Sequence, residues 1–411
     1  MKYPITPDYI KHAPDGIAAL YTRLESWILR DICERFKRAD KATETAIEHI
    51  RNLQRRGYSY QDIRDYVKTT NKLTDAQFDK LIKDAVDRNQ RYYTDVLREE
   101  RLVREVFESE DMAREINAII EQAKGDLNNI TGTMGFCMKT AGKVEFLPIA
   151  KAYQRVLTDA EMKVYTGAQS YNEAIRDAVK QLTDSGIRVV TWAKNGEVYH
   201  TDHIDVAARR AVMTGTTQIA GKYNEEIRKE VPTEYIEVTA HSGARDVDVV
   251  GRPWANHKNW QGKVYSTKDG DKYPNIYKVC GWGEVDGLEG ANCRHLHFPF
   301  WDGISERTYT DEQLKNIDPE PMTFRGQKMR PYEASQRQRA IERQLRKIKR
   351  EMLGYSAAGD ASAYRDAAIK YRNLNALYTD FCEQTGLRPT ERGNIAEFGP
   401  SDAKRALKSI G

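Results

Sequence analysis

Cysteine and histidine side chains at short spacing are the groups in this sequence best suited to chemistry. If the segment CRHLHF is a β-strand, the alternation of side chains puts Cys293, His295 and His297 on one face of it. Thiolate and imidazole ligands two residues apart can bind one Zn²⁺, and His241 or His257 could complete a tetrahedron. The favoured interpretation is a packed, hydrogen-bonded cluster of histidine, tryptophan and arginine that stabilises a loop-rich module, so we expect no cofactor. Zinc is the alternative, with His241, His257, Cys293 and His295 as its candidate ligands.

The other motifs of the sequence yield no catalytic residue. There is neither a GxxxxGK[ST] phosphate loop nor a GxSxG nucleophile elbow, and Gly281 and Gly283 lack the third glycine of a dinucleotide fingerprint. The rival hypothesis is a metal-dependent nuclease or toxin-like enzyme carried by residues 237–325, because Asn256 and His257 precede further Cys and His residues. That hypothesis lacks a supporting ligand spacing, so we expect a protein that is not an enzyme.

A second candidate surface is a basic segment near the C-terminus. The whole chain has 65 Lys and Arg against 61 Asp and Glu, a net charge of +4, whereas residues 325–350 hold ten basic and two acidic residues. A strongly basic helix face binds phosphates without reading sequence, with an affinity that falls as salt rises, or binds an acidic partner surface. An ordinary solvated helix is the alternative. The candidate DNA-contact residues are Arg337, Arg339, Arg343, Arg346, Lys347, Lys349 and Arg350.

The elements that must position these residues are mostly helices. Apolar residues at three- and four-residue spacing predict a helix over 17–36, and capping boxes at Ser59 and Thr74 predict that two further helices begin there. A break is expected near Ser109. Helices are also predicted over the segment SYNEAIRDAVKQLTDS before Gly186 and over about 203–229. In the last segment, two apolar stripes predict an antiparallel helical hairpin with one basic limb.

Strands are expected mainly in the middle of the chain. Residues 187–201 read as a β-hairpin with Asn195 and Gly196 in the turn, and residues 235–239 read as a strand. GKVYS and KYP, on either side of a KDGD turn, suggest another hairpin. The fold class is therefore α+β and helix-rich. We expect four consecutive segments: a helical arm over 1–125, a mixed α/β region over 126–236, a His/Trp/Cys module over 237–324, and a basic helical hairpin and tail over 325–411.

Composition excludes several classes of protein. No window approaches the roughly 18 consecutive apolar residues that a membrane span needs, and the N-terminal sequence MKYPITPDYIKHAPDG has no apolar core of a signal peptide. Five scattered cysteines argue against a disulfide scaffold. We therefore expect no membrane partner.

Several blocks of the sequence, in order, resemble the phage minor capsid protein 2 family. They include SYNEAIRDAVKQLTDSGIRVV, IDVAARRAVMTGTTQIAG, EVTAHSGAR, NHKNWQGKVYS and CGWGEVDGLEGANCRHLHFPF, and the similarity covers roughly residues 1–325. The AHSGAR, NHKNWQGKVYS and GANCRH blocks are also similar in layout to Mu-type head-morphogenesis proteins, which more often have a second cysteine where this chain has His295. The family-motif residues are His241, Gly243, Arg245, His257, Trp260, Gly262, Asn292, Cys293, Arg294 and His295.

This resemblance implies a structural protein of a tailed bacteriophage. It implies synthesis in the bacterial cytoplasm and incorporation into the virion in few copies, in the head interior or at the portal vertex. The implied partners are the portal protein, the major capsid or scaffolding protein, and packaged double-stranded DNA bound non-specifically. The implied role is in head assembly and in DNA packaging or release.

Overall fold

A computed structural model describes residues 3–37, 45–140, 142–194 and 197–389 of the chain. These residues form two compact units, each assembled from separate stretches of sequence. Unit 1 contains residues 1–17, 74–127 and 208–335, and unit 2 contains 18–73, 128–207 and 336–411. The boundaries fall inside helices α2, α4, α6, α9 and α13. The division into four consecutive segments, expected from the sequence, remains a prediction.

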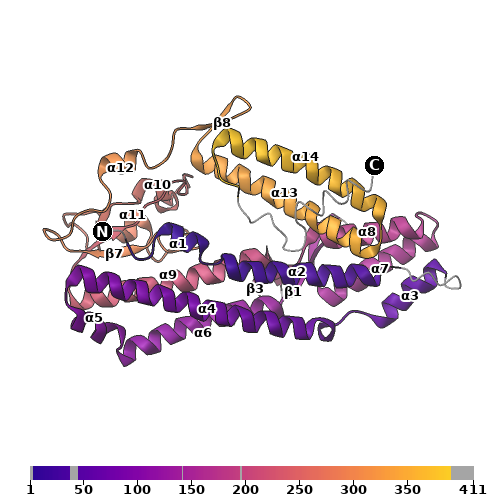
Figure 1. The fold of residues 1–411 in the computed structure, drawn as a ribbon, viewed down its shortest axis with the longest axis horizontal. Coiled ribbons are helices and arrows are strands. Elements are labelled where there is room, and N and C mark those ends of the chain that lie inside the picture. The colour runs from indigo at the N-terminus through magenta and orange to yellow at the C-terminus, as the bar shows by residue number, and fades with distance from the viewer. Residues whose placement is uncertain (1–2, 38–44, 141, 195–196, 390–411) are drawn as a thin grey trace. The chain divides into compact units, whose positions relative to one another are not determined.

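Unit 1 combines long helices with a small sheet and a loop-rich region (Figure 1). Its three-stranded antiparallel sheet has the order β6-β5-β7. Its helices and strands, some of which begin or end in unit 2, are α1 (Pro7–His12), α4 (Tyr60–Leu97), α5 (Glu100–Phe107), α6 (Glu110–Gly132), α9 (Ile204–Glu230), β5 (Tyr235–Val238), η1 (Pro253–Ala255), α10 (His257–Trp260), β6 (Val264–Ser266), α11 (Ile276–Cys280), β7 (His297–Phe300), α12 (Asp311–Lys315), β8 (Met322–Phe324) and β9 (Gln327–Met329).

Glycines inside α9 permit close packing in unit 1. A Cβ atom on Gly215 would lie 3.0 Å from the Cβ of Ala123 on α6 and 3.1 Å from the ring of Phe78 on α4. A Cβ on Gly221 would lie 3.3 Å from the imidazole of His297. The absence of a side chain at these positions therefore sets how near α9 lies to its neighbours.

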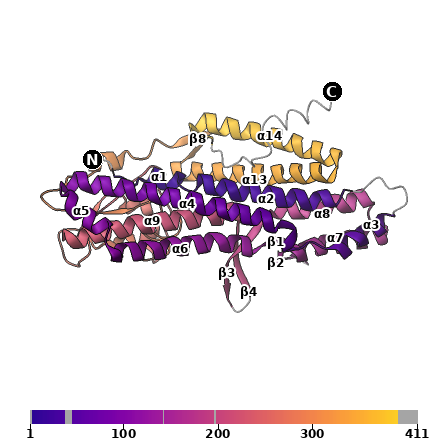
Figure 2. The ribbon, with the colours of Figure 1, turned by 60° about the horizontal axis from the view of Figure 1, so that its bottom comes forward.

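Unit 2 combines a four-stranded antiparallel sheet with helices. Its sheet has the order β2-β1-β3-β4, and Figure 2 shows the β3–β4 ladder projecting from the rest of the sheet. The elements are α2 (Asp15–Arg35), α3 (Ala46–Arg56), β1 (Met134–Thr140), β2 (Lys143–Pro148), α7 (Ile149–Tyr165), α8 (Tyr171–Ser185), β3 (Arg188–Lys194), β4 (Glu197–His203), α13 (Pro331–Ala358) and α14 (Ala361–Thr385).

Local sequence signals explain where the unit 2 helices begin and end. Capping boxes at Thr45 and Ser170 begin α3 and α8, and Gly186 ends α8 with a φ of +62°. Only glycine fits there, because a Cβ would lie 2.7 Å from the carboxylate of Glu25 and 2.8 Å from the guanidinium of Arg350. Helices α13 and α14 form the predicted hairpin (Figure 1).

The helix-rich α+β class is confirmed, as are most of the expected helices and the 188–203 hairpin, whose predicted turn at 195–196 lies outside the described residues. The capping box at Thr74 is wrong, since Thr74 is buried inside the continuous helix α4. No glycine or proline occurs over 60–97, and the apolar spacing continues through this position. The chain instead breaks at Arg98, with a φ of +55°, as well as near Ser109.

Two strand predictions in the loop-rich region are also wrong. The strand β6 pairs with β5 rather than with the KYP segment, which is held to Ser266 by a single parallel bridge at Asn275. The strand β7 begins at His297, so Cys293 and His295 lie in the loop before it. Pairing with β5 extends only from Tyr235 to Val238, which limits β7 to four residues. The hairpins β1–β2 and β8–β9 and the helix α7 were not predicted.

Among the described residues, no helix is both long and apolar enough to cross a membrane.

Candidate functional site

The motif residues of the sequence gather in the loop-rich region of unit 1. An apolar cluster lies between the β6-β5-β7 sheet and the short helices α10 and α11, which Figure 1 shows close to β7. This cluster contains Trp260 from α10, Cys280 from α11 and Cys293 from the loop before β7. The buried members of the cluster are Ile236, Val238, Trp260, Tyr265, Ile276, Cys280, Leu288 and Cys293.

Three of the four candidate metal ligands converge at the edge of this cluster. The Sγ of Cys293 lies 3.5 Å from the Nδ1 of His295 and 3.7 Å from the Nδ1 of His257. One donor atom from each of the three residues lies within 4.8 Å of the others. The exposed fractions are 4% for Cys293, 3% for His257 and 1% for His295. A phosphodiester substrate could not reach an ion at this point without movement of the surrounding loops, so the geometry gives the nuclease hypothesis no support.

The second nitrogen of each histidine faces an acceptor. The Nε2 of His257 lies 2.9 Å from the backbone oxygen of Asp286, and the Nε2 of His295 lies 3.1 Å from the Oε1 of Gln261. The same Oε1 accepts a hydrogen bond of 2.9 Å from the backbone N–H of His241. Because these partners are acceptors, both imidazoles carry their proton on Nε2 and turn the lone pair of Nδ1 toward Cys293.

Burial keeps this group uncharged. It lowers the pKa of His257 to about 4 and, with the neighbouring cationic and histidine side chains, holds the pKa of His295 well below its usual range. Burial also raises the pKa of the Cys293 thiol to about 11, although backbone hydrogen bonds at His295 and Glu289 oppose that shift. At neutral pH the three side chains are therefore a thiol and two neutral imidazoles.

His241, the fourth candidate ligand, lies beside this group rather than in it. Its ring stacks on that of His295 with 4.5 Å between centroids. Its Nδ1 lies 2.9 Å from the backbone oxygen of Ser242 and 3.1 Å from the guanidinium of Arg294. Burial, followed by the charge of Arg294, lowers the pKa of His241 to about 3. His241 therefore packs as a neutral ring.

His297 does not share a face with Cys293 and His295, so that expectation is wrong. Its Nδ1 lies 2.7 Å from Glu289 and its Nε2 lies 3.1 Å from Glu225 on α9. Burial alone would lower the pKa of His297, but the two carboxylates raise it to about 9. The side chain is a buried imidazolium that ties β7 to α9. The sequence offered no signal for this pairing, because Glu225 is 72 positions away and lies on a helix rich in charge.

The other motif residues shape the loops around the three donors. Arg245 donates to the backbone oxygens of Asp286 (3.1 Å) and Ala291 (3.3 Å), which are loop positions flanking the site. Asn292, with a φ of +59°, makes the turn before Cys293. Trp260 donates to the backbone oxygen of Trp254.

Two motif glycines allow close or strained backbone positions. A Cβ on Gly262 would lie 2.3 Å from the side chain of Leu314. Gly243, with a φ of +69°, donates its N–H to Asp318 at 2.7 Å. The motif thus positions a compact loop structure. The backbone acceptor at Asp286 and the side chain of Gln261 were missed by sequence reasoning, since a hydrogen-bond partner of a histidine has no fixed spacing.

The seven candidate DNA-contact residues differ in their exposure to solvent. Arg337, Arg339 and Arg343 are exposed on α13. Arg346 pairs with Asp205, and Lys347 pairs with Asp184 at 3.2 Å. Lys349 and Arg350, only 3% and 5% exposed, are buried within unit 2. Including those two was therefore wrong, because α13 turns them toward the core and a buried side chain cannot reach a phosphate.

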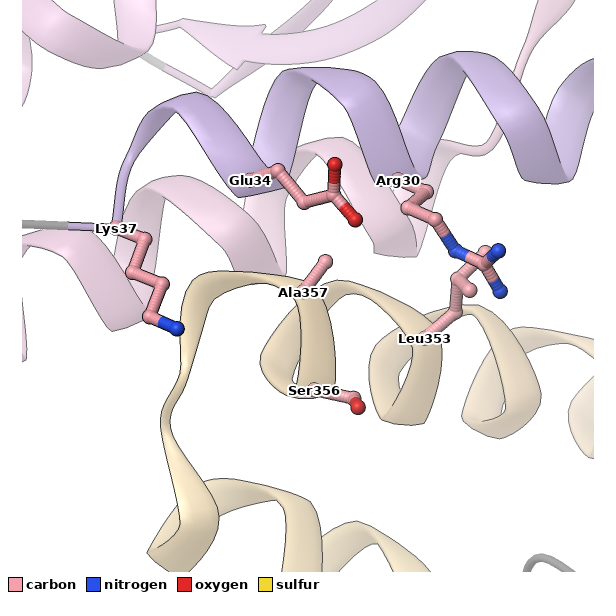
Figure 3. Close-up of a pocket in the computed structure, with 6 residues that line it drawn as sticks. All are labelled: Arg30, Glu34, Lys37, Leu353, Ser356 and Ala357. Carbon is pink, nitrogen blue, oxygen red and sulfur yellow. The ribbon is translucent and has the colours of Figure 1, made fainter.

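A pocket of about 480 Å³ lies between α2 and α13 within unit 2 (Figure 3). Charged side chains from α2 and from Lys37, two residues after its end, line one side, and Leu353, Ser356 and Ala357 of α13 line the other. The charged lining residues are Arg30, Glu34 and Lys37.

The sequence of this chain is similar to a known protein family and to two phage proteins. A family model described as phage minor capsid protein 2 matches residues 5–383. The chain is 26% identical over 348 residues to a structural protein of Lactococcus phage LL-H, which covers 81% of this chain and 86% of that protein. It is 33% identical over 91 residues to a structural protein of Lactococcus phage mv4, covering 22% of this chain and 64% of that protein. No solved structure matches the chain significantly.

Proposed function

Because this chain belongs to the phage minor capsid protein 2 family, we propose that it is a low-copy structural component of a tailed-phage head, located at the portal vertex. The observation that carries this proposal is the family match over residues 5–383, together with the similarity to a phage structural protein over 81% of the chain. The protein acts through interfaces with the portal protein and the major capsid or scaffolding protein, and it has no catalytic role.

The distribution of side chains supports a role in interfaces. The groups best suited to chemistry are buried in loops that they hold together, whereas the long helices expose charged residues of both signs. Exposed charges of both signs on a helix face favour a partner with a complementary charge pattern. The helical N-terminal segment is our candidate for the contact with the portal or capsid.

Contact with packaged DNA is part of the same proposal. Arg337, Arg339 and Arg343 are exposed on α13, and α14 exposes Arg365, Lys370 and Arg372. Exposed guanidinium and ammonium groups neutralise phosphates without base contacts. The hairpin of α13 and α14 would therefore bind DNA regardless of sequence during packaging or release.

Quantitative mass spectrometry of density-purified phage particles tests the proposal. We expect the protein in mature particles at a small fraction of the abundance of the major capsid protein. Cross-linking within intact particles should join this chain to the portal protein. Presence in the infected lysate but absence from purified particles would overturn the structural assignment. Presence at the abundance of the major capsid protein, or cross-links confined to capsid faces, would overturn the location at the portal vertex.

A further inference from the structure

We propose that His257, Cys293 and His295 bind one zinc ion, through the two Nδ1 atoms and Sγ, as a structural centre of the loop-rich region of unit 1. This inference does not depend on the proposed location in the phage head. It differs from the ligand set expected from the sequence, because His241 is not a ligand.

The hydrogen bonds of the two histidines prepare both of them to bind metal. The backbone oxygen of Asp286 and the Oε1 of Gln261 are acceptors, so they fix the proton of each imidazole on Nε2. The orientation of the Gln261 amide is itself set by the backbone N–H of His241, which requires an oxygen at that point. Histidine ligands of metals characteristically donate their other N–H to such an oxygen, which fixes the ring and its tautomer.

Without a metal, the three side chains present two nitrogen lone pairs that accept hydrogen bonds but only one thiol proton to donate. Two buried Nδ1 lone pairs face one sulfur, and a thiol has a single proton to donate. One of the two Nδ1 atoms is then a buried acceptor facing no donor within the triad. When Zn²⁺ binds, the thiol proton leaves to solvent and the thiolate and both imidazoles donate their lone pairs to the ion. One proton is released for each ion bound, and every donor in the group is satisfied.

The distances from the sulfur to the two nitrogens fit tetrahedral zinc. Bonds of about 2.3 Å to sulfur and about 2.1 Å to nitrogen, at the tetrahedral angle, place sulfur and nitrogen about 3.6 Å apart. The two distances in the structure are 3.5 and 3.7 Å. One thiolate and two imidazoles form a donor set that zinc accepts, and a non-protein ligand such as water completes the coordination.

The position of the three residues explains what the ion would do. His257 begins α10, whereas Cys293 and His295 belong to the loop before β7. Between His257 and Cys293, all of which the structure describes, the regular elements are the rest of α10, the three-residue strand β6 and the short helix α11. A shared ion would link α10 to that loop directly, so the free energy of zinc binding would stabilise the folded loops.

Elemental analysis of the untagged full-length chain, purified under reducing conditions without chelator, provides the first test. We expect about one zinc ion per chain. After removal of zinc, titration with Co²⁺ should produce a thiolate-to-cobalt charge-transfer band and the intense visible bands of tetrahedral cobalt. Chelation should also lower the melting temperature. Absence of zinc from the wild-type chain, together with no charge-transfer band on adding Co²⁺, would overturn the proposal whether or not any variant folds.

Matched variants identify the ligands. Cys293→Ala should abolish the charge-transfer band, whereas Cys280→Ala, which alters a buried cysteine of the same apolar cluster, should keep it. His241→Ala should leave the cobalt spectrum unchanged, and a changed spectrum would restore His241 as a ligand. Gln261→Leu should weaken zinc binding by about ten- to a hundredfold because His295 loses its acceptor, and Gln261→Glu should rescue it. A band retained in Cys293→Ala would overturn the assignment.

Discussion

Lys349 illustrates how burial changes the role of a basic side chain. It belongs to the basic run of α13, but it is only 3% exposed, and its ammonium group lies over the ring of Tyr371 on α14, 5.4 Å from the centroid. Burial lowers its pKa from 10.5 to about 8. The charged form is therefore less stable in the folded protein than in the unfolded chain.

This shift predicts a pH dependence of stability. Below about pH 8, Lys349 is protonated in both the folded and unfolded states, so it contributes no slope. Between about pH 8 and 10.5 the unfolded chain binds more protons, so the free energy of unfolding rises with pH. At about 1.4 kcal/mol per pKa unit, the shift from 10.5 to about 8 gives a rise of at most about 3.5 kcal/mol. Lys349→Met should remove this rise and stabilise the protein at pH 7 by about 1–3 kcal/mol, as measured by urea denaturation.

Lys347→Met is the matched control for that measurement. Lys347 is partly exposed and pairs with Asp184, so its replacement should change the free energy of unfolding by less than about 1 kcal/mol at any pH. Comparing the two variants also cancels the titration of Tyr371, whose pKa burial raises. If Lys349→Met kept the alkaline rise, Lys349 would not be its source.

The candidate metal site could be predicted from the sequence only in part. Residue types and the resemblance of the blocks picked out His257, Cys293 and His295, which the structure brings together. The alternation rule failed for His297, because the strand begins at that residue rather than at Cys293. Sequence spacing could not exclude His241 as a metal ligand, because its distance from the Sγ of Cys293 depends on the conformation of a loop. Loop conformations follow from hydrogen bonds between distant residues, and a single sequence does not encode those pairs visibly.

At the scale of elements, long periodic helices were predictable and short strands were not. The apolar spacing of α2, α8 and α9 directly predicted these helices, and Gly186 marked the end of α8. The strand β6 depends on its pairing with β5, 27 residues earlier, rather than on the local turn at KDGD. Strand pairing is decided by long-range contacts that local propensity does not report.

The helix α13 has two functional sides that composition alone could not separate. Its basic residues looked equivalent in sequence, but the inward ones bind structural carboxylates and carbonyls. Arg350, for example, donates to the backbone oxygen of Thr183 at 3.1 Å and pairs with Glu25. The outward arginines Arg337, Arg339 and Arg343 are exposed to solvent, where a phosphate backbone can reach them.

Neutralising those arginines tests DNA contact by the helix. The triple variant Arg337→Gln, Arg339→Gln and Arg343→Gln should weaken binding to duplex DNA of any sequence at low salt. Because each phosphate contact contributes about 0.9 to the salt dependence, the slope of log K against log salt should fall by about 3. Fluorescence anisotropy with a labelled duplex over a salt series measures both quantities.

A control with the same loss of charge uses three exposed lysines of α4. Lys68→Gln, Lys80→Gln and Lys83→Gln should leave affinity and slope nearly unchanged, since these residues lie on another helix. An equal loss in both triple variants would mean that net charge, rather than α13, attracts DNA. If the wild-type chain bound no DNA at low salt, the DNA contact itself would be excluded.

At the scale of the whole molecule, unit 1 is held together by residues far apart in the sequence. The ring of Tyr3 stacks on Phe298 with 4.2 Å between centroids, and its hydroxyl donates to the buried carboxylate of Glu237. From α9, Asn224 donates to the backbone oxygen of His297 at 2.6 Å. These contacts come from the first residues of the chain and from the helix before β5. The loop-rich region therefore uses outside residues to cover its sheet and satisfy its buried polar groups.

The isolated fragment 237–324 should for this reason fail to fold. It lacks Tyr3, leaving Glu237 and Phe298 uncovered. It also lacks α9, which leaves the backbone oxygen of His297 without Asn224 and its buried imidazolium without Glu225. Buried groups without partners cost about 1–3 kcal/mol each, and a small domain has about 5–15 kcal/mol of stability in total. We expect poor NMR dispersion and no cooperative melting of 237–324 in the presence of zinc, and partial ordering of 204–335. Cooperative folding of 237–324 alone would instead establish that segment as an independent domain.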